Sequence, residues 1–303
     1  MKTNPFKSPG QWYRGNTHSH STESDGRLPM DERFAAYREH GYDFLVLTDH
    51  RTVNDVSSFS TDGFLAISGS EVHPSNPYGG DTYHIVAIDV HERINCTELH
   101  PNDVIQEIKS QGGEAVLCHP YWCGHTLLDY LPLHDYFAVE VYNDTCMGIG
   151  KGFSEQAWDE LLDKAGRVYG ISADDSHGTE HDCFHAWVHV KATALSTEAI
   201  MSAFRDGAFY STLGPEIHDL DLVDVEDSQR EKAKKIVVKC EEAQAITFKS
   251  QRSRGKHLTA TDGELLTEAE YIVPESAKYV RVEITTPDGK KAWSNPFFFD
   301  NRG

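Results

Sequence analysis

The sequence has no apolar stretch long enough to cross a membrane, and its first residues, MKTNPFKSPGQWYRGN, lack the apolar core of a secretory signal. Its six cysteines form no CxxC pair and lack the spacing of a small disulfide-bonded scaffold. We therefore expect free thiols in a reducing compartment, with a disulfide framework or a zinc knuckle as the alternatives. These absences favour a cytoplasmic protein with no membrane partner.

Basic residues are few beside acidic ones, because 28 Lys and Arg stand against 48 Asp and Glu, for a formal net charge of −20. A general binder of nucleic acid or of anionic membranes needs a basic surface, so this balance argues against both partners. It does not exclude an anionic small-molecule substrate, since bound cations can reverse the sign of the field inside one cleft.

Internal repeats and low-complexity segments are also missing, whereas histidine is abundant, with 17 residues in a chain of 303. Many of these histidines stand beside Asp, Ser or Pro rather than being scattered along helix faces. The length is sufficient for one large enzyme domain and a smaller appendage.

Short apolar runs alternate with helical patterns over the first two thirds of the chain. The runs that predict strands are WYRGNTHSHS, FLVLTDH, FLAISGSEVH, HIVAIDV, AVLCHP, FAVEVYN and VYGISADDSH, with WVHVKA after them. Continuous Val, Ile and Leu runs between helices indicate a mostly parallel sheet that is buried on both faces. About seven such strands favour an α/β fold in which the sheet closes into a distorted barrel.

The pattern changes after Gly214 and Pro215, where the segments KIVVKC, AITFKS, KYVRVEITT and NPFFFD are separated by turn signals and by no convincing helix. We therefore predict two domains, an enzymatic barrel at residues 1–214 and a small antiparallel β-sandwich at residues 215–303.

Polar side chains collect where the predicted strands end, except for His84, which opens the fourth strand. In a parallel β/α barrel the carboxyl ends of the strands converge on one rim, which is where active sites lie. The residues concerned are His18, His20, Asp25, Asp49, His50, Glu71, His84, His119, Asp174, Asp175 and His177.

Their spacing suits metal binding. His18 and His20 are two residues apart on a strand, so both side chains point to the same face, and Asp175 and His177 repeat that spacing. Imidazole with carboxylate suits Zn²⁺, Mn²⁺ or Fe²⁺. Each element also has an ordinary structural interpretation, because a single strand-end histidine can be a packing residue and Glu71 can accept bonds from backbone amides. The joint occurrence on one rim favours the metal site.

In their order, the motifs resemble those of the PHP family, the polymerase and histidinol phosphatase domain. THSHS with SDG is followed by TDH, GSE, a histidine opening the next strand, CHP and DDSH. The resemblance covers residues 11–213. The entry segment WYRGNTHSHS, the late segment AFRDGAFYSTLGP and the β-rich tail resemble the two-domain branch that includes carbaryl-hydrolase-like proteins.

The resemblance implies a distorted (β/α)7 barrel that holds two to three divalent ions. His18, His20, Glu71 and Asp175 would hold the first ion, and Glu71 would bridge to a second, completed by His84 and His119. The third would be held by Asp25, His50 and His177, although many relatives have histidine in place of Asp25. His73, His125, His181 and His185 are spare candidates. His73 would share the face of Glu71 if the strand continued past Pro74.

A metal-dependent hydrolase follows as the predicted function, with water activated by the ions as the nucleophile. Asp175 is the candidate for the catalytic ligand that also takes a proton. The candidates for substrate contacts are Arg51, Tyr121, His125 and Asn143, with Trp122 beside them. The expected substrate is an anionic phosphoester of a small molecule; the alternatives are a carboxylic or carbamate ester or amide, and a non-catalytic binding module.

Overall fold

Seven strands follow one another around a barrel in the computed structural model, which describes residues 1–227, 230–261 and 263–299. The barrel strands are β1 (Gln11–Asn16), β2 (Phe44–Leu47), β3 (Leu65–Val72), β4 (Ile85–Ile88), β5 (Glu114–Leu117), β6 (Ala138–Asn143) and β7 (Tyr169–Ala173). The helices are α1 (Met30–Glu39), α2 (Pro101–Ser110), α3 (Pro120–Cys123), α4 (Leu127–Tyr130), α5 (Glu155–Lys164) and α6 (Thr197–Asp206). Three short 3-10 helices, η1 (Pro5–Lys7), η2 (Ser57–Phe59) and η3 (Thr145–Ile149), lie in the connections.

The strands are parallel except around β4, which pairs antiparallel with both β3 and β5. Residues 73–84 connect β3 to β4 without a helix, and an antiparallel neighbour needs no helical crossover. The barrel closes between β1 and β7, where Asp175 N donates to His18 O at 3.0 Å and His20 N donates to Ser176 O at 2.9 Å. The predicted distorted α/β barrel is confirmed.

The apolar runs are continuous because both faces of the sheet are buried. In β2, Phe44 and Val46 join the cluster shared by strands around the barrel, whereas Leu45 and Leu47 pack with Phe34 of α1. Helix α6 adds Phe204 to the same cluster, with its ring 6.2 Å from that of Phe44 at the start of β2. Helix α6 therefore covers the end of the barrel where β2 begins, and leaves the carboxyl ends of the parallel strands open.

Strands β8 (Trp187–Ala192) and β9 (Phe209–Thr212) connect the barrel to the C-terminal strands. β8 pairs antiparallel with β1 and β9, and β9 pairs with β16 (Lys291–Ser294). The same sheet continues through β15 (Tyr279–Thr285) to β12 (Ala245–Ser250) and β13 (Gly255–Thr259), with β17 (Phe297–Phe298) at its side. Hydrogen bonds thus cross the proposed division at residue 214, and that division stays a prediction.

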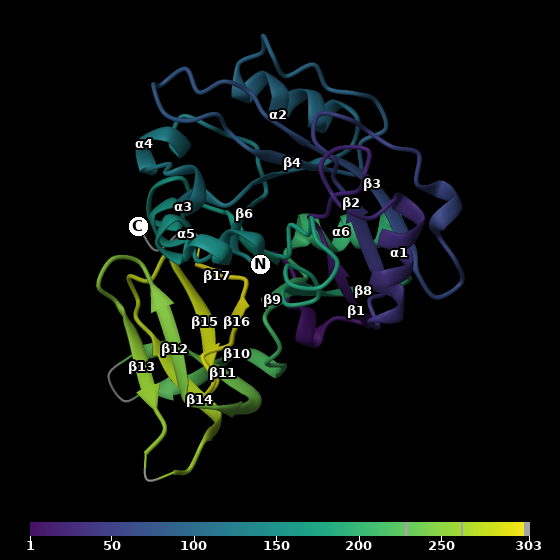
Figure 1. Ribbon diagram of the computed structural model, residues 1–303. Coiled ribbons are helices and arrows are strands. Elements are labelled where there is room, and N and C mark those ends of the chain that lie inside the picture. Colours follow the sequence, from purple (N-terminus) through teal and green to yellow (C-terminus); the bar gives the residue numbers. More distant parts are fainter. Residues whose placement is uncertain (228–229, 262, 300–303) are drawn as a thin grey trace.

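Strands β10 (Ile217–Asp227), β11 (Arg230–Ala243) and β14 (Leu266–Val273) form a second, antiparallel sheet. Ile236 and Val238 of β11 share an apolar cluster with Val282 and Ile284 of β15, so the two sheets enclose one core. The C-terminal strands of both sheets lie below the barrel in Figure 1. The segment from 215 onward has no helix among its described residues, in agreement with the predicted antiparallel sandwich.

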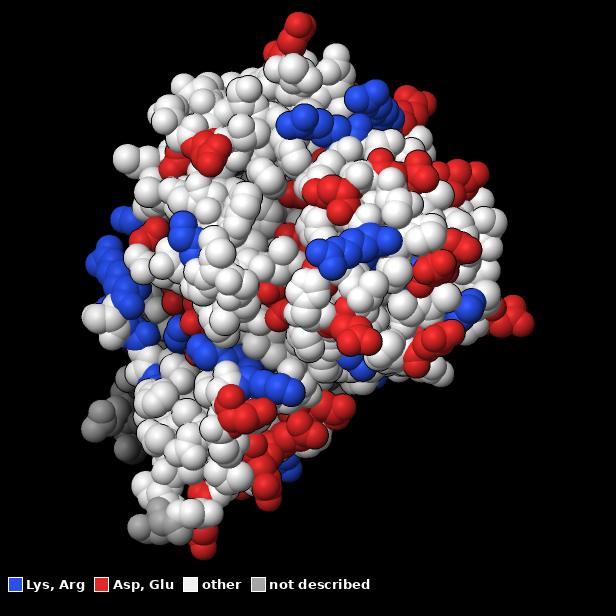
Figure 2. Space-filling model, viewed as in Figure 1, with Lys and Arg blue, Asp and Glu red and all other residues white. Residues whose placement is uncertain are grey.

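The described helices include none with the length and apolar content that crossing a membrane requires. All six cysteines are buried free thiols. Acidic side chains are spread over both the barrel and the C-terminal strands on the face shown in Figure 2, in keeping with the large negative net charge.

The contact between the two parts depends on alternation along β15. Side chains along β15 alternate between two faces, one of which points into the core between the two sheets. The other face is directed at α5, and Arg281 on this face is 0% exposed. Its Nε and Nη2 donate to Asp159 Oδ1 at 2.9 and 2.7 Å, its Nη1 donates to Glu283 Oε2 at 3.3 Å, and its guanidinium lies 4.4 Å from the ring of Trp158.

Replacing Arg281 by Met should lower the free energy of unfolding by about 1 to 3 kcal/mol, because Asp159 and buried Glu283 each lose a charge-assisted hydrogen bond, although Lys249 and Lys291 still pair with Glu283. Urea denaturation measures the loss. Lys7→Met is the control, since the Lys7–Asp219 pair is 43% and 40% exposed and its loss should cost less than about 1 kcal/mol. Equal costs for the two variants would contradict this account of the contact.

Candidate metal centre

Glu71, near the end of β3, is the carboxylate around which the predicted residues gather. It is 1% exposed, and ring nitrogens of histidines face each of its two oxygens. Those nearest Oε2 belong to His50 at 2.9 Å, His18 at 3.2 Å and His20 at 3.5 Å. Those nearest Oε1 belong to His84 at 2.6 Å, His119 at 3.4 Å and His73 at 3.6 Å. A carboxylate with imidazoles on both oxygens has the arrangement needed to bridge two ions.

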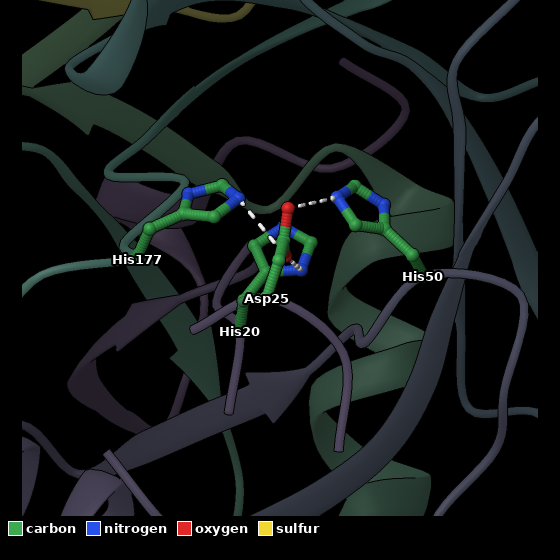
Figure 3. A group of neighbouring side chains, drawn as sticks. All are labelled: His20, Asp25, His50 and His177. Atoms are coloured by element: carbon green, nitrogen blue, oxygen red, sulfur yellow. Dashed lines mark ion pairs between the residues drawn. The ribbon is translucent and has the colours of Figure 1, made fainter. Parts of the chain in front are cut away.

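Asp25 lies at the outer side of the cluster and is 56% exposed. Its carboxylate lies between the rings of His50 and His177, with Oδ2 3.3 Å from His50 Nε2 and Oδ1 3.4 Å from His177 Nε2 (Figure 3). His20 completes this group, and its Nδ1 is 3.9 Å from Asp25 Oδ1. The loop that carries Asp25 is tied down by buried Asp49, which accepts hydrogen bonds from the Ser21 amide and the Ser24 hydroxyl at 2.7 Å each.

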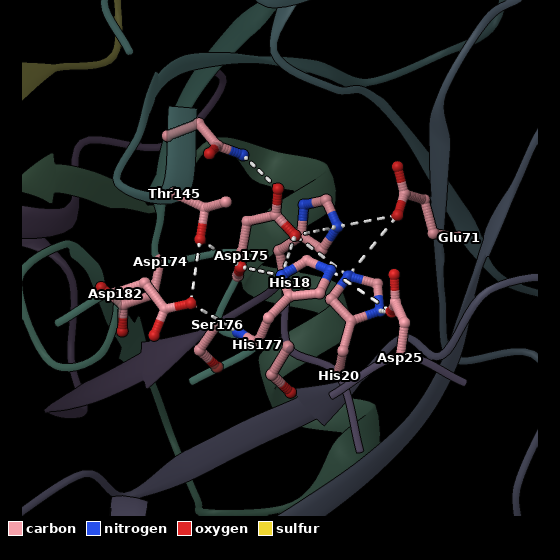
Figure 4. Close-up of polar contacts among 12 residues, drawn as sticks. His18, His20, Asp25, Glu71, Thr145, Asp174, Asp175, Ser176, His177 and Asp182 are labelled. Atoms are coloured by element: carbon pink, nitrogen blue, oxygen red, sulfur yellow. Dashed lines mark hydrogen bonds and ion pairs between the residues drawn. The ribbon is translucent and has the colours of Figure 1, made fainter. Parts of the chain in front are cut away.

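Asp175 faces the first pair of histidines. Its Oδ1 is 3.1 Å from His18 Nε2 and 3.0 Å from His20 Nε2 (Figure 4). With Glu71, these three residues offer four ligand atoms that all lie within 4.8 Å of one another. The adjacent Asp174 turns away, because its carboxylate accepts from Tyr37 Oη and from the amides of Phe184, His185 and Ala186.

His84 and His119 form a further group with Glu71, again within 4.8 Å. His119 follows β5, as expected for a strand-end residue. His84 precedes β4, and it reaches the same rim because β4 runs antiparallel and therefore begins where β3 ends. The structure thus brings together all nine residues that the sequence proposed as ligands, in the groupings that the resemblance implied except that His20 also joins the Asp25 group. Their role as ligands stays a prediction.

Hydrogen bonds behind the cluster determine which ring nitrogens face inward. His18 Nδ1 donates to Glu140 Oε1 at 2.6 Å, and His177 Nδ1 donates to the Asp175 carbonyl at 2.8 Å. Each bond places the proton on Nδ1 and leaves the lone pair of Nε2 directed at the centre. His119 Nδ1 also has a hydrogen-bond partner behind the cluster, because it lies 3.3 Å from Cys123 Sγ.

Glu140, in β6, was missed by the sequence analysis. It is buried and also accepts from the His119 amide and from Asn143 Nδ2, both at 2.9 Å. The available signal was a single acidic residue inside the apolar run FAVEVYN, since a carboxylate in a doubly buried strand needs several donors.

The electrostatics keep the two central carboxylates ionised. Burial alone would raise the pKa of Glu71, but His18, His119 and His50 around it lower the pKa well below its ordinary value. Burial would likewise raise the pKa of Asp175, and His18 and His20 outweigh that effect and lower it. Both groups therefore have the charge that cation binding requires.

Four buried ring nitrogens have no hydrogen-bond partner among the described residues, and all four surround these carboxylates. An unpartnered buried nitrogen is costly, and a cation would satisfy it. The nitrogens are His18 Nε2, His20 Nδ1, His50 Nδ1 and His73 Nε2. The donor set therefore fits divalent metal binding, as imidazole and carboxylate ligands would.

The backbone is also unusual at this rim. Arg51, His119 and Asp175 adopt positive φ angles of 56°, 27° and 57°, in the region that residues other than glycine rarely occupy. Such conformations persist where surrounding structure imposes them, and they gather at functional sites.

The predicted substrate residues lie at different distances from the centre. A cavity of about 240 Å³ is lined by the ligand cluster together with Trp122, Thr145 and Cys146. Tyr121 and His125 line a separate depression beside α5, and Arg51 lines another one. Asn143 is fully buried and donates to Asp175 Oδ2 at 3.1 Å, so it stands behind a ligand rather than in the cavity.

Of the spare histidines, His73 joins the cluster. His185 instead pairs with Asp144 at 2.7 Å, and His125 Nε2 bonds to the Asp81 carbonyl at 2.9 Å. Among the described residues, the potential metal-binding groups include none of His125, His181 and His185.

Fold and site together define a distorted α/β barrel with a histidine–carboxylate centre at the open end of its strands. Over its whole length the chain is similar to a two-domain protein from Bacteroides vulgatus that contains a predicted PHP-like metal-dependent phosphoesterase. The TM-score is 0.53 at 17% identity, and the match covers 99% of each chain. At this identity the likeness establishes a shared fold.

A weaker likeness joins 55% of the chain to 89% of an amidohydrolase from Chromobacterium violaceum with bound sulfate and no metal, at a TM-score of 0.43 and 17% identity. No conclusion about this chain rests on it. No family model matches the sequence, and no curated protein matches it either.

Replacing Glu140 by Gln should weaken divalent-metal affinity by roughly 10- to 100-fold, because His18 loses the carboxylate that orients its ring. Competition with a chromophoric chelator measures the affinity. Glu114→Gln is the matched control, since Glu114 is equally buried but pairs with Lys109 and Arg205 away from the centre. Unchanged affinity in the Glu140 variant would show that His18 is oriented without it.

Proposed function

We propose that this chain is a metal-dependent hydrolase of the PHP family that cleaves a phosphoester of a small molecule. The observation that carries the proposal is Glu71, a buried carboxylate whose two oxygens face separate sets of imidazoles. The family rests on the order of the motifs, and the full-length likeness to a protein containing a PHP-like phosphoesterase supports it. The branch similar to carbaryl-hydrolase-like proteins is proposed on the sequence segments and the C-terminal sandwich.

Two or three divalent ions, Zn²⁺, Mn²⁺ or Fe²⁺, are the proposed cofactors. The residues that would hold them are His18, His20, Asp25, His50, Glu71, His84, His119, Asp175 and His177. When bound, such ions acidify water towards neutral pH and neutralise charge on the oxygens of the reacting group.

Asp175 is the proposed catalytic residue. Its carboxylate lines the cavity, which places an acceptor oxygen for a proton beside the proposed ligands. The Asn143 amide holds the other carboxylate oxygen at 3.1 Å and fixes the orientation of Asp175. Asn143 therefore acts on the reaction by positioning a catalytic group.

An anionic substrate is favoured by two arginines that line a depression separate from the cavity over the cluster. Arg51 follows the proposed ligand His50, and its amide donates to the Glu71 carbonyl at 2.8 Å. Arg51 and Arg93 line one depression of about 320 Å³ together with Asn95 and Thr97. Neither guanidinium has an ion-pair partner in the described parts of the chain, so both are available to a phosphate group.

The second candidate function is hydrolysis of a carboxylic or carbamate ester or amide. Trp122 favours it, because this residue is 41% exposed, lines the cavity and lies edge-on to His84 and His119 at ring distances of 5.6 and 5.1 Å. An aromatic wall of this kind suits an apolar or aryl group on a neutral substrate. A non-catalytic binding module is the third candidate.

Small-molecule substrates are the proposed partners, and nucleic acid and membranes are not. The net charge of −20 would repel both polyanions outside the local arginine pair. We propose the cytoplasm as the location, on the free cysteines.

Purified protein supplied with Mn²⁺ or Zn²⁺ should hydrolyse p-nitrophenyl phosphate and be inhibited competitively by inorganic phosphate. Replacing His20 or Glu71 by Ala should lower kcat/KM at least 100-fold, because each change removes a proposed ligand shared by two ion positions. Elemental analysis of the same preparations measures the metal content.

His91→Ala is the control, because His91 is exposed and outside the cluster, and its activity should equal that of the wild type. Hydrolysis of 1-naphthyl acetate or carbamate without phosphatase activity would reverse the order of the two hydrolase proposals. Less than one equivalent of metal and no turnover with added ions would favour the binding module.

Replacing Arg51 by Met should raise KM for phosphoesters roughly tenfold, since one charge-assisted hydrogen bond to phosphate is lost, with kcat nearly unchanged. Steady-state kinetics measure the two constants separately. Arg38→Met, an exposed substitution near the end of α1, should leave both unchanged. A loss in kcat alone would mean that Arg51 acts on the reacting group rather than on substrate binding.

A further inference from the structure

His73 lies at the centre of the cluster, yet the family resemblance assigns it no role. It directly follows β3, and its ring stacks on that of His84 with centroids 4.1 Å apart. The ring of His50 is 4.7 Å away. The side chain is 10% exposed, and its Nε2 lies 3.6 Å from Glu71 Oε1.

The state of His73 Nε2 distinguishes it from a histidine that only fills space. This nitrogen is buried and has no hydrogen-bond partner among the described residues. Partly buried His189 shows the ordinary arrangement, because its Nε2 accepts a hydrogen bond from Trp187 Nε1 at 2.9 Å. The Glu71 carboxylate already contacts five other imidazoles, so a shared cation satisfies His73 and Glu71 together.

We propose that His73 is a metal ligand, and that His73, Glu71 and His50 form an ion position distinct from the three groups implied by the family resemblance. The inference rests on the proposed metal centre. Ligand atoms of these three residues all lie within 4.8 Å of one another, and two imidazoles with one carboxylate are a donor set suited to Zn²⁺ or Co²⁺.

This position competes with the Asp25 position for His50. His50 Nδ1 lies 2.9 Å from Glu71 Oε2, while His50 Nε2 lies 3.3 Å from Asp25 Oδ2. A neutral imidazole offers a lone pair on one nitrogen only, so His50 serves one of the two positions at a time. Because Asp25 is the exposed partner, its position is the weaker of the two, so the ion of His50 lies mainly at His73 and lies there alone once the Asp25 carboxylate is removed.

The test is titration of metal-free protein with Zn²⁺ by calorimetry, and with Co²⁺ by visible absorption, which reports the ligands around the ion. His73→Phe should weaken one ion at least tenfold. Asp25→Asn should keep the wild-type number of ions with a changed Co²⁺ spectrum. The double variant should lose one equivalent relative to Asp25→Asn.

His189→Phe is the matched control and should bind ions as the wild type does. His73→Cys guards against a folding defect, because a thiolate at this position should restore binding and add a thiolate-to-Co²⁺ charge-transfer band to the difference spectrum against wild type. Unchanged stoichiometry and affinity on loss of His73, in both the wild-type and Asp25→Asn backgrounds, would overturn the inference. A wild-type protein that binds no ion would overturn the proposed metal centre itself.

Discussion

The centre of this protein is organised by one buried carboxylate that is shared among many imidazoles. Glu71 holds rings that come from four strand ends, and each ring must present a nitrogen to it rather than to solvent or to backbone. That requirement explains the layer behind the cluster, where Glu140 and the Asp175 carbonyl accept the protons of the outward nitrogens. It also explains why backbone at His119 and Asp175 adopts conformations that cost energy elsewhere in a chain.

The barrel supplies the rigidity that this arrangement needs. Strands buried on both faces tolerate little movement, because Phe44 and Val46 fill the interior while Leu45 and Leu47 are held by α1. The closing hydrogen bonds between residues 18–20 and 175–176 lie at the level of the ligands themselves. Closure of the barrel and assembly of the centre are therefore one event, so that His18, His20 and Asp175 come together only in the closed sheet.

The surfaces around the candidate centre differ in their chemical character. The cavity over the ligands has an aromatic wall at Trp122, whereas the depression next to His50 is lined by Arg51 and Arg93. A substrate that reaches from the ions towards the arginines would present an anionic group, and one that lies against the tryptophan would present an apolar group. The two hydrolase proposals thus differ in which of these surfaces the substrate would contact. The ring of His73 packs against that of His50 and lies near Glu71.

The sequence by itself determined the strand runs, the distorted α/β barrel and the antiparallel C-terminal sheets, because period-two and doubly buried patterns are local properties of the chain. It also singled out most strand-end ligands, since His18 with His20 and Asp175 with His177 are neighbours in sequence. Only the tertiary structure explained why His84, at the start of a strand, reaches the rim. The residues of β4 do not determine whether it runs parallel or antiparallel to β3. The positions of Glu140 and His73 were likewise established only by the tertiary structure. Glu140 lies behind His18, and His73, which directly precedes Pro74, lies beside Glu71. Contacts between distant segments of the chain determine both positions.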